Sequence, residues 1–323
     1  MVRSFVLIIL IMELTVMALG TIVDRHLSPV KNVGELKETI LAAETGKYHS
    51  FTESISINLG RSQSRPDVKA KCQMAYSKVQ FQDYDGKSHL FNFALCDSIV
   101  KNSQINRKNT KVKIGKGAHQ VAINFDNQYF ESILTIYREE IRKLGLNKVQ
   151  AAKFIVSSIQ SIPYTLLHVH SHKDAENPQT YINEGAPKSV ANAFANKIKN
   201  YHQRKKMLIP LDQVGGCQEN VTPNGFVSPI EMIMTQMGDC DTRTITLYLL
   251  LKSFGFDVIE LVSDVESHAI IAINLPIAGG KVYYPFRGKK YYIWETTSKH
   301  YPGTHPDGVR YMKNWKNWKV ELS

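Results

Sequence analysis

Residues 238 to 255 decide the fold and read GDCDTRTITLYLLLKSFG. The leucine-rich part predicts a helix with Cys240 in its first turn, in which Asp239 caps the free amide groups and Gly255 ends the helix. The helix dipole favours negative charge where the sulfur lies, and the thiolate is the nucleophilic form of cysteine. The carboxylates of Asp239 and Asp241 oppose this effect. We therefore expect a nucleophilic cysteine only if a cationic histidine lies nearby.

Three strands are predicted after this helix, at residues 258–263, 268–273 and 291–294. His268 opens the second strand, whose other residues are apolar, and Glu295 directly follows the third. If the strands are antiparallel neighbours, the histidine approaches the cysteine sulfur and the glutamate holds the far nitrogen of the imidazole. A nucleophile, a base and an orienting acid arranged in this way perform acyl transfer.

In this order, the residues resemble the core of the transglutaminase-like superfamily, in particular its bacterial cysteine-peptidase-like members. The motifs that carry the resemblance are Gly238-Asp239-Cys240-Asp241, Phe254-Gly255-Phe256-Asp257-Val258, Ser267-His268-Ala269, Tyr292-Ile293-Trp294-Glu295-Thr296-Thr297 and, ahead of them, Ile159-Gln160-Ser161-Ile162-Pro163-Tyr164. The resemblance covers about residues 126 to 300. It implies an α+β, papain-related fold in which the helix carrying the cysteine packs on an antiparallel sheet.

The resemblance also assigns roles to three side chains: Cys240 as nucleophile, His268 as base and Glu295 as orienting acid. The third position departs from the family pattern, which has aspartate there. Glutamate carries the same charge on a side chain that is one methylene longer. The triad therefore requires the strand before Glu295 to lie slightly farther from the histidine.

The composition is that of a packed globular protein: 323 residues, 43% of them hydrophobic and 21% charged. This excludes a disordered tail, and the length suits about two domains. We expect a small β-rich module at residues 21–125 and a transglutaminase-like domain at residues 126–323. The formal net charge of +11 favours acidic partners or an anionic surface, such as an anionic cell-surface polymer, without identifying one.

The first twenty residues have the features of a signal peptide. Arg3 precedes a mostly apolar run from residue 5 to 19, and the run ends at Ala18-Leu19-Gly20, with small residues at the two positions that a signal peptidase reads. We expect residues 1–20 to direct export to the periplasm or the cell exterior. The alternative is an uncleaved membrane anchor, although the run is shorter than the roughly twenty residues of a membrane span.

A β-hairpin is predicted around Asp85-Gly86, because apolar residues alternate on both sides of it. With a three-residue loop at 85–87, the expected pairs are Phe81 with Phe91 and Val79 with Phe93. This register does not place Cys72 opposite Cys96. Both cysteines nevertheless flank the hairpin in an oxidising compartment, so they are either bridged or free.

Two helices are predicted next, at residues 130–144 and 147–159. Gly145 has the position of a left-handed C-terminal cap, and Asn147 that of an N-cap. The polar stretch 101–119 is interpreted as the connection out of the first module, and residues 168–213 as a long surface loop.

Other groups have two interpretations each. His168, His170 and His172 alternate and therefore either share one face of a strand and hold zinc or copper, or lie in a solvated loop. The latter is the commoner case, and we expect no metal and no cofactor. Cys217 is either bridged to Cys240, which would mask the nucleophile, or a packed free thiol near the site.

The sequence thus supports two hypotheses. The first is an exported thiol enzyme that acts on protein, peptide or amide-containing substrates through Cys240, His268 and Glu295, as a peptidase or amidase rather than by amine cross-linking. The second is a non-catalytic binding or scaffold protein that retains the fold. The basic run of residues 197–206 either touches an anionic polymer or forms a solvated helix face. No nucleic-acid partner is expected, because no binding motif is present.

Overall fold

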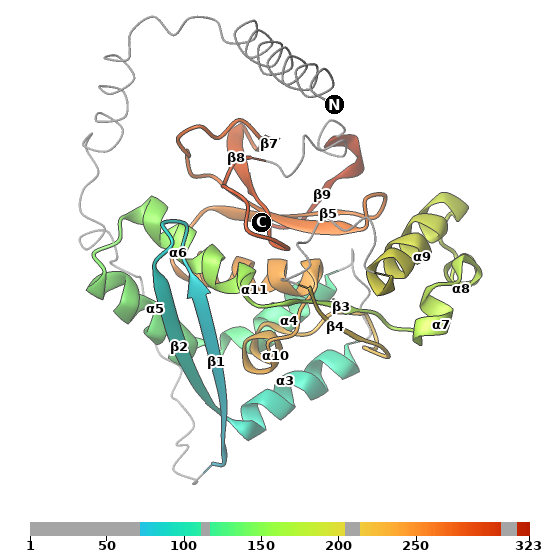
Figure 1. Ribbon diagram of the computed structural model, residues 1–323, viewed down its shortest axis with the longest axis horizontal. Helices are drawn as coiled ribbons and strands as arrows, with labels where there is room; N and C mark the ends of the chain where they lie inside the picture. Colours follow the sequence, from blue (N-terminus) through green and yellow to red (C-terminus); the bar gives the residue numbers. More distant parts are fainter. Residues whose placement is uncertain (1–71, 111–116, 204–213, 305–314) are drawn as a thin grey trace, which may run out of the picture. The chain divides into compact units, whose positions relative to one another are not determined.

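The computed structural model describes residues 72–110, 117–203, 214–304 and 315–323, which all belong to one compact unit. These residues form a mixed α+β structure of helices, antiparallel sheets and one parallel pair of strands (Figure 1). The expected signal peptide and residues 21–71 of the expected first module lie outside the described residues. Within the described ranges, no helix is both long and apolar enough to cross a membrane.

A five-stranded antiparallel sheet carries the predicted strands in the order β7-β8-β6-β5-β9. The strands are β5 (Val258–Ser263), β6 (His268–Ile273), β7 (Tyr283–Phe286), β8 (Lys289–Trp294) and β9 (Lys319–Leu322). Their alternating side chains form a core on one face, which contains Ile259, Leu261, Ile270, Ala272, Tyr291, Ile293 and Trp318. The prediction that the three strands after the cysteine helix are antiparallel neighbours is confirmed.

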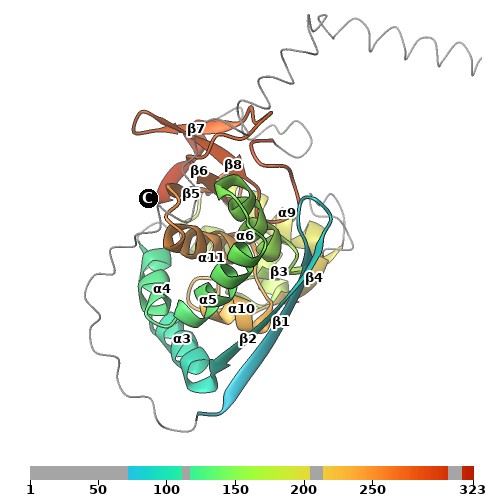
Figure 2. The same ribbon diagram turned by 90° about the vertical axis from the view of Figure 1, so that its left-hand side faces the viewer.

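The other face of this sheet packs on helix α11 (Cys240–Ser253), which contacts β5 and β6. Helices α4 (Ala118–Asn127), α6 (Lys148–Gln160) and α10 (Pro229–Thr235) also contact α11 (Figure 2). Every residue from 242 to 251 is buried, so α11 is a central helix and not an amphipathic surface helix. Its predicted ends are confirmed: Asp239 Oδ1 accepts a hydrogen bond from the Thr242 N–H at 3.2 Å, and Gly255 is left-handed with φ 73°.

The predicted hairpin consists of β1 (Met74–Gln82) and β2 (Ser88–Cys96), but its register differs from the expected one. Val79 pairs with Phe91, not with Phe93, because the loop has five residues, 83–87. Asp83 Oδ1 closes this loop by accepting hydrogen bonds from the N–H groups of Asp85 and Lys87, both at 2.9 Å. A shift of two residues keeps the same side chains on the apolar face, so the hairpin packs as expected.

A disulfide joins Cys72 to Cys96 at the open end of the hairpin. The bridge forms although the two residues are not directly paired, since Cys72 lies just before β1 and Met74 pairs with Cys96. Of the two alternatives left open by the sequence, the structure therefore has the bridged one.

The interpretation of residues 101–119 as a connection is wrong for most of that stretch, which lies in helices α3 (Asp97–Asn109) and α4. Two of the three buried residues of α3, Ser103 and Arg107, are polar and only Val100 is apolar, so no apolar periodicity indicated the helix. Arg107 forms a buried ion pair with Glu231 of α10 at 2.7 Å, and Ser103 hydrogen-bonds to Asp126 at 2.6 Å. The module boundary expected at residue 125 falls inside α4.

Helices α5 (Glu131–Lys143) and α6 agree with the two predicted helices. Asn147 and Gln150 form a capping box at the start of α6, and Gly145 is left-handed with φ 62°. The hairpin packs on α5, α6 and α10.

The described part of residues 168–213 is largely helical, so the prediction of a long surface loop is wrong. It contains α7 (His172–Ala175), α8 (Pro178–Asn183) and α9 (Lys188–His202) between the parallel strands β3 (Tyr164–Leu167) and β4 (Val214–Gln218). The buried side of α9 consists of Ala191, Ala195, Ile198 and Tyr201. Small and polar residues around these positions obscured the helical pattern in the sequence.

Candidate active site

Cys240 is the first residue of α11, at the end of the helix that faces β5 and β6. Its side chain is 4% exposed and packs with Val262 of β5 and Ala269 of β6. In this register Ser263 pairs with His268, so His268 lies next to the residues that surround the sulfur. The position of the cysteine is thus determined by the packing of a helix end on two adjacent strands.

The structure brings the three residues predicted from the sequence together. The Cys240 side chain hydrogen-bonds to the imidazole of His268, and Nε2 of the same ring lies 3.2 Å from Glu295 Oε2. Because the carboxylate engages Nε2, Nδ1 is the ring nitrogen left to face the sulfur. One imidazole therefore bridges the thiol and the carboxylate.

The Glu295 carboxylate is held by several donors. Its Oε1 accepts hydrogen bonds from the N–H groups of Thr296 and Thr297, both at 2.9 Å, and from the Thr297 hydroxyl at 2.7 Å. Burial alone would raise the pKa of this carboxyl, but the charge of His268 and these hydrogen bonds hold the pKa well below its usual value. Glu295 is therefore ionised at neutral pH.

His268 is cationic at neutral pH. Burial by itself lowers the pKa of the imidazole, but the charge of Glu295 and the hydrogen bonds to Cys240 and Glu295 raise it to about 10. The positive ring next to the sulfur provides the cation that a nucleophilic cysteine needs in the presence of Asp239 and Asp241.

No protein-family profile, curated protein or solved structure matches this chain. The likeness to the transglutaminase-like superfamily rests on the motifs and remains a prediction.

A second set of residues positions Glu295 through its backbone. Gln160, at the end of α6, donates its Nε2–H to the carbonyl of Glu295 at 2.6 Å. The hydroxyl of Tyr84, in the hairpin loop, in turn donates to Gln160 Oε1 at 3.0 Å and to the carbonyl of His300 at 2.8 Å. The hairpin therefore supports the acidic end of the triad.

Arg243 is a further positioning residue, and it is fully buried one turn after the cysteine. Its guanidinium donates to the carbonyls of Gly238 and Thr296, both at 3.1 Å, and to those of Ile159 and Ile162. It thereby joins the turn before α11, the end of α6 and the segment after Glu295. This role of Arg243 could not be predicted from the sequence, because an arginine in a helical first turn carries no signal that its partners are backbone groups far along the chain.

Two other buried groups lie close to the sulfur. Burial and the charge of Asp241 raise the pKa of Asp239 to about 7. Burial, followed by the charges of Cys240 and Asp239, raises the pKa of Tyr164 well above its usual value. Tyr164 is therefore a neutral phenol close to the site.

Cys217 is not bridged to Cys240, since both are free thiols. Burial, followed by the charge of Glu219, raises the pKa of Cys217 to about 11. Cys217 lies among His168, His172 and His202. His170, which the sequence grouped with its neighbours, lies apart from them, 3.4 Å from Glu184 Oε2.

One residue of the basic run 197–206 contacts the candidate active site. Lys197 of α9 donates its ammonium to the carbonyl of Ser267, directly before the histidine. Residues 204–206 of the run lie outside the described residues.

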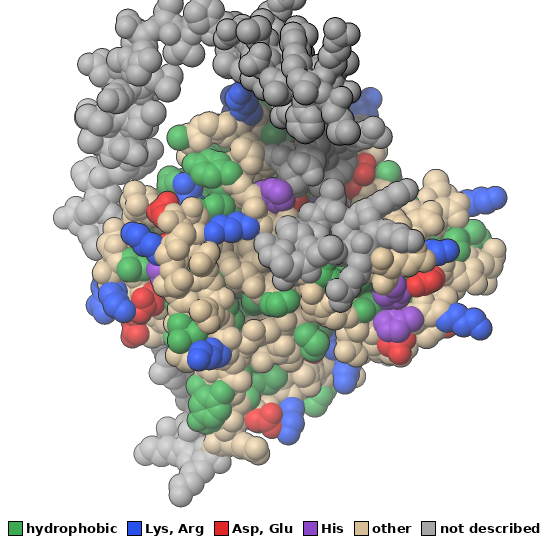
Figure 3. Space-filling model, viewed as in Figure 1, with side chains coloured by type: hydrophobic (Ala, Val, Ile, Leu, Met, Phe, Trp, Pro, Cys, Tyr) green, Lys and Arg blue, Asp and Glu red, His purple; other side chains and the backbone are tan. Residues whose placement is uncertain are grey.

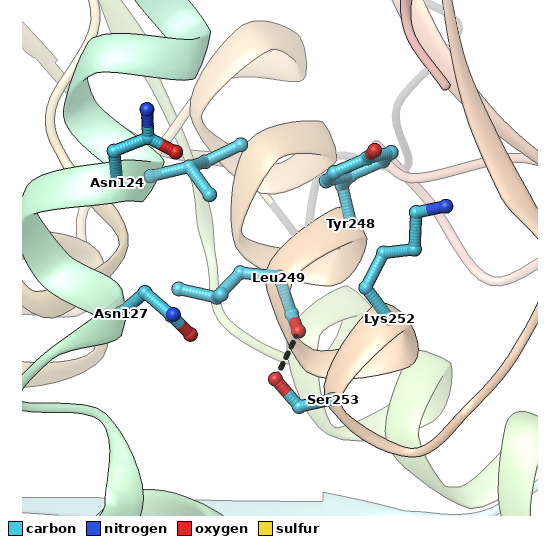
Figure 4. Close-up of a pocket in the computed structure, with 7 residues that line it drawn as sticks. Asn124, Asn127, Tyr248, Leu249, Lys252 and Ser253 are labelled. Carbon is cyan, nitrogen blue, oxygen red and sulfur yellow. Dashed lines mark hydrogen bonds between the residues drawn. The ribbon is translucent and has the colours of Figure 1, made fainter. Parts of the chain in front are cut away.

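A shallow pocket lies between α4 and α11 (Figure 4). Its lining residues are Ile123, Asn124, Asn127, Tyr248, Leu249, Lys252 and Ser253. These α11 residues begin eight positions after Cys240, which is about 12 Å along a helix. The pocket is therefore separate from the candidate active site.

Proposed function

We propose that the chain is a thiol enzyme with a papain- or transglutaminase-like core that transfers or hydrolyses acyl groups of peptide or carboxamide substrates. The observation that carries the proposal is the position of the His268 imidazole, which bonds to the Cys240 side chain on one side and to Glu295 on the other. A buried cationic imidazole in this position favours the thiolate, and the start of α11 favours it further.

The first step is attack of the Cys240 sulfur on the substrate carbonyl carbon, which forms a C–S bond. The backbone N–H of Cys240, at the start of the helix, helps to stabilise the oxyanion. His268 then gives its proton to the leaving amine as the C–N bond breaks, and a thioester remains on the sulfur. Glu295 keeps the imidazole oriented throughout.

The second step releases the acyl group. His268, now neutral, takes a proton from the acceptor, which attacks the thioester and regenerates the thiolate. Water as acceptor gives a peptidase or amidase, and an amine gives a transglutaminase. We propose hydrolysis as the main reaction and export through residues 1–20 as the route to the substrate. The second hypothesis, a non-catalytic scaffold, predicts an ordinary thiol at position 240.

The test is the rate of alkylation of each free cysteine at pH 6, measured by peptide mass spectrometry after treatment with iodoacetamide. Cys240 is expected to react rapidly at a pH where an ordinary thiol is protonated, and His268→Ala is expected to abolish this reactivity. Cys217 serves as an internal reference in the same sample, and Cys217→Ser as the matched control variant.

Equal, slow labelling of both cysteines in the folded wild-type chain would favour the scaffold hypothesis. A pool of peptides treated with the wild-type chain and with Cys240→Ser then tests the reaction itself. Cleavage or deamidation by the wild type alone supports the enzyme.

A further inference from the structure

A second group of reactive side chains lies outside the candidate triad. One donor atom from each of His168, His172, His202 and Cys217 lies within 4.8 Å of all the others. We propose that these four residues form a binding site for a divalent transition-metal ion, with Zn²⁺ as the preferred occupant. The proposal is independent of the proposed thiol chemistry.

The sulfur–nitrogen distances within the cluster are close to those of a tetrahedral site, and all four donor atoms lie within 4.8 Å of one another. Cys217 Sγ is 3.3 Å from His168 Nε2, 3.3 Å from His202 Nε2 and 3.8 Å from His172 Nδ1. In a tetrahedron with the usual Zn–S and Zn–N bond lengths, sulfur and nitrogen are about 3.5 Å apart. Binding of an ion therefore needs the imidazoles to move closer to one another around a sulfur that is already near them. Imidazole and thiolate are also the ligands that zinc prefers over magnesium or calcium.

Three elements and the residue directly after a fourth supply the four ligands. Cys217 is on β4, where it pairs with Leu166 of β3, and His168 follows β3 directly. His172 begins α7, and His202 ends α9. Figure 3 shows histidine side chains beside acidic ones on the side of the molecule where α7 to α9 lie. His172 is exposed and His202 and Cys217 are half-buried, so an ion can reach the site from solvent.

Carboxylates around the cluster orient its ligands. His202 Nδ1 lies 2.6 Å from Glu176 Oε1, and a proton on Nδ1 leaves the Nε2 lone pair for the ion. Such carboxylate–histidine pairs are typical of zinc sites. Glu219 Oε2 accepts a hydrogen bond from the backbone N–H of His172 at 2.7 Å. The first contact orients the ring of His202 and leaves its coordinating atom open. The second holds only the backbone of His172, whose Nδ1 lies 4.0 Å from Glu219 Oε2.

The same atoms have a competing interpretation as a second thiol triad made of Cys217, His202 and Glu176. A triad uses one imidazole, whereas here three imidazoles surround the sulfur. In addition, Cys217 lies in a strand and so lacks the helix N-terminus that assists Cys240. Metal binding accounts for all four side chains, and the triad accounts for two of them.

A site with four protein ligands leaves no open coordination position and is structural. The bound ion would connect α7 and α9 to the β3–β4 strand pair. The same pair reaches the candidate active site, because Thr165 of β3 donates its N–H to the carbonyl of Gly238 at 3.2 Å. We therefore expect metal binding to stabilise the frame that precedes Cys240.

The test uses the full chain without an affinity tag, stripped with a chelator and then titrated with Co²⁺ as a spectroscopic probe for Zn²⁺. One equivalent of Co²⁺ is expected to give intense tetrahedral d–d bands and a thiolate-to-metal charge-transfer band, and one equivalent of Zn²⁺ is expected to displace it. Cys217→Ser should abolish the charge-transfer band, and Glu176→Gln should weaken binding about 10- to 100-fold.

Two matched controls test the location of the site. His170→Gln removes a neighbouring histidine that lies outside the cluster, and Cys240→Ser removes the other free thiol, so both should bind Co²⁺ as the wild type does. Zn²⁺ should also protect Cys217, but not Cys240, from iodoacetamide. Weak octahedral bands in the wild type, loss of the charge-transfer band in Cys240→Ser, or unchanged alkylation of Cys217 with Zn²⁺ would each overturn the proposal.

Discussion

Shortening Glu295 to aspartate is expected to detach the carboxylate from His268. The substitution withdraws the carboxylate by about 1.5 Å, the length of one C–C bond. The backbone cannot easily follow, because Gln160 holds the Glu295 carbonyl at 2.6 Å. The present contact of 3.2 Å therefore opens well beyond hydrogen-bonding distance. Loss of a hydrogen bond between charged groups corresponds to about 1.5–3 kcal/mol, or roughly 10- to 100-fold in an equilibrium or rate.

The assay is the pKa of His268, followed by NMR of the imidazole protons. It should fall from about 10 to roughly 8–9 in Glu295→Asp, the change that a 10- to 100-fold effect corresponds to, because the hydrogen bond is lost while the charge of the carboxylate stays nearby and still opposes the effect of burial. Glu295→Gln is the matched control, because it keeps the side-chain length and removes the charge, and it should lower the pKa further, since burial, the largest influence, is then opposed only by Cys240. A value near 10 in the aspartate variant would refute the argument that the longer side chain is required here.

Three further predictions concern the pH dependence and the stability of the fold. The pKa of Glu295 is lower in the folded than in the unfolded chain, so the stability that its charge contributes is complete above pH 4.5 and is lost as the pH falls below that value. The difference in the free energy of unfolding between wild type and Glu295→Gln, measured by urea denaturation at a series of pH values, should therefore shrink in acid. A constant difference would contradict this. Arg243→Met removes the guanidinium donor from four carbonyl groups, of which those of Gly238 and Ile159 keep the backbone N–H groups of Thr165 and Ile162, and should reduce the free energy of unfolding by at least about 2 kcal/mol, whereas a loss under 1 kcal/mol would mean that water replaces the guanidinium. The double variant Cys72→Ser, Cys96→Ser removes a cross-link with a sequence separation of 24 and should reduce the free energy of unfolding by about 3 kcal/mol. Its unfolding midpoint is compared with that of the wild type with and without reductant. Equal midpoints in all three samples would show that the bridge does not form.

The elements around Cys240 could be predicted because their signals are local. Asp239 and Gly255 mark the ends of α11, and apolar strands follow it in the sequence. The order of cysteine, histidine and acid then predicts their approach once the strands are antiparallel. The convergence of these three side chains could therefore be predicted from the sequence.

The elements that the sequence did not reveal are stabilised by partners far along the chain. Helix α3 turns Ser103 and Arg107 towards the core, and these residues are tolerated there only because Asp126 and Glu231 meet them. The register of the hairpin depends on the carboxylate of Asp83, which a count of apolar residues does not detect. The histidines from α7 and α9 meet Cys217 only through the parallel pairing of β3 and β4.

The contact of Tyr84 with Gln160 and His300 determines where a shorter fragment of the protein can begin. A fragment that begins at residue 126 retains Cys240, His268 and Glu295 but lacks the phenol that connects the hairpin loop to both sides of the acidic residue. Such a truncated chain would also expose the apolar face of α6 on which β1 packs. Expression boundaries for the part that carries the candidate active site should therefore be placed before Cys72, and inactivity of a shorter soluble fragment would not argue against the proposed chemistry.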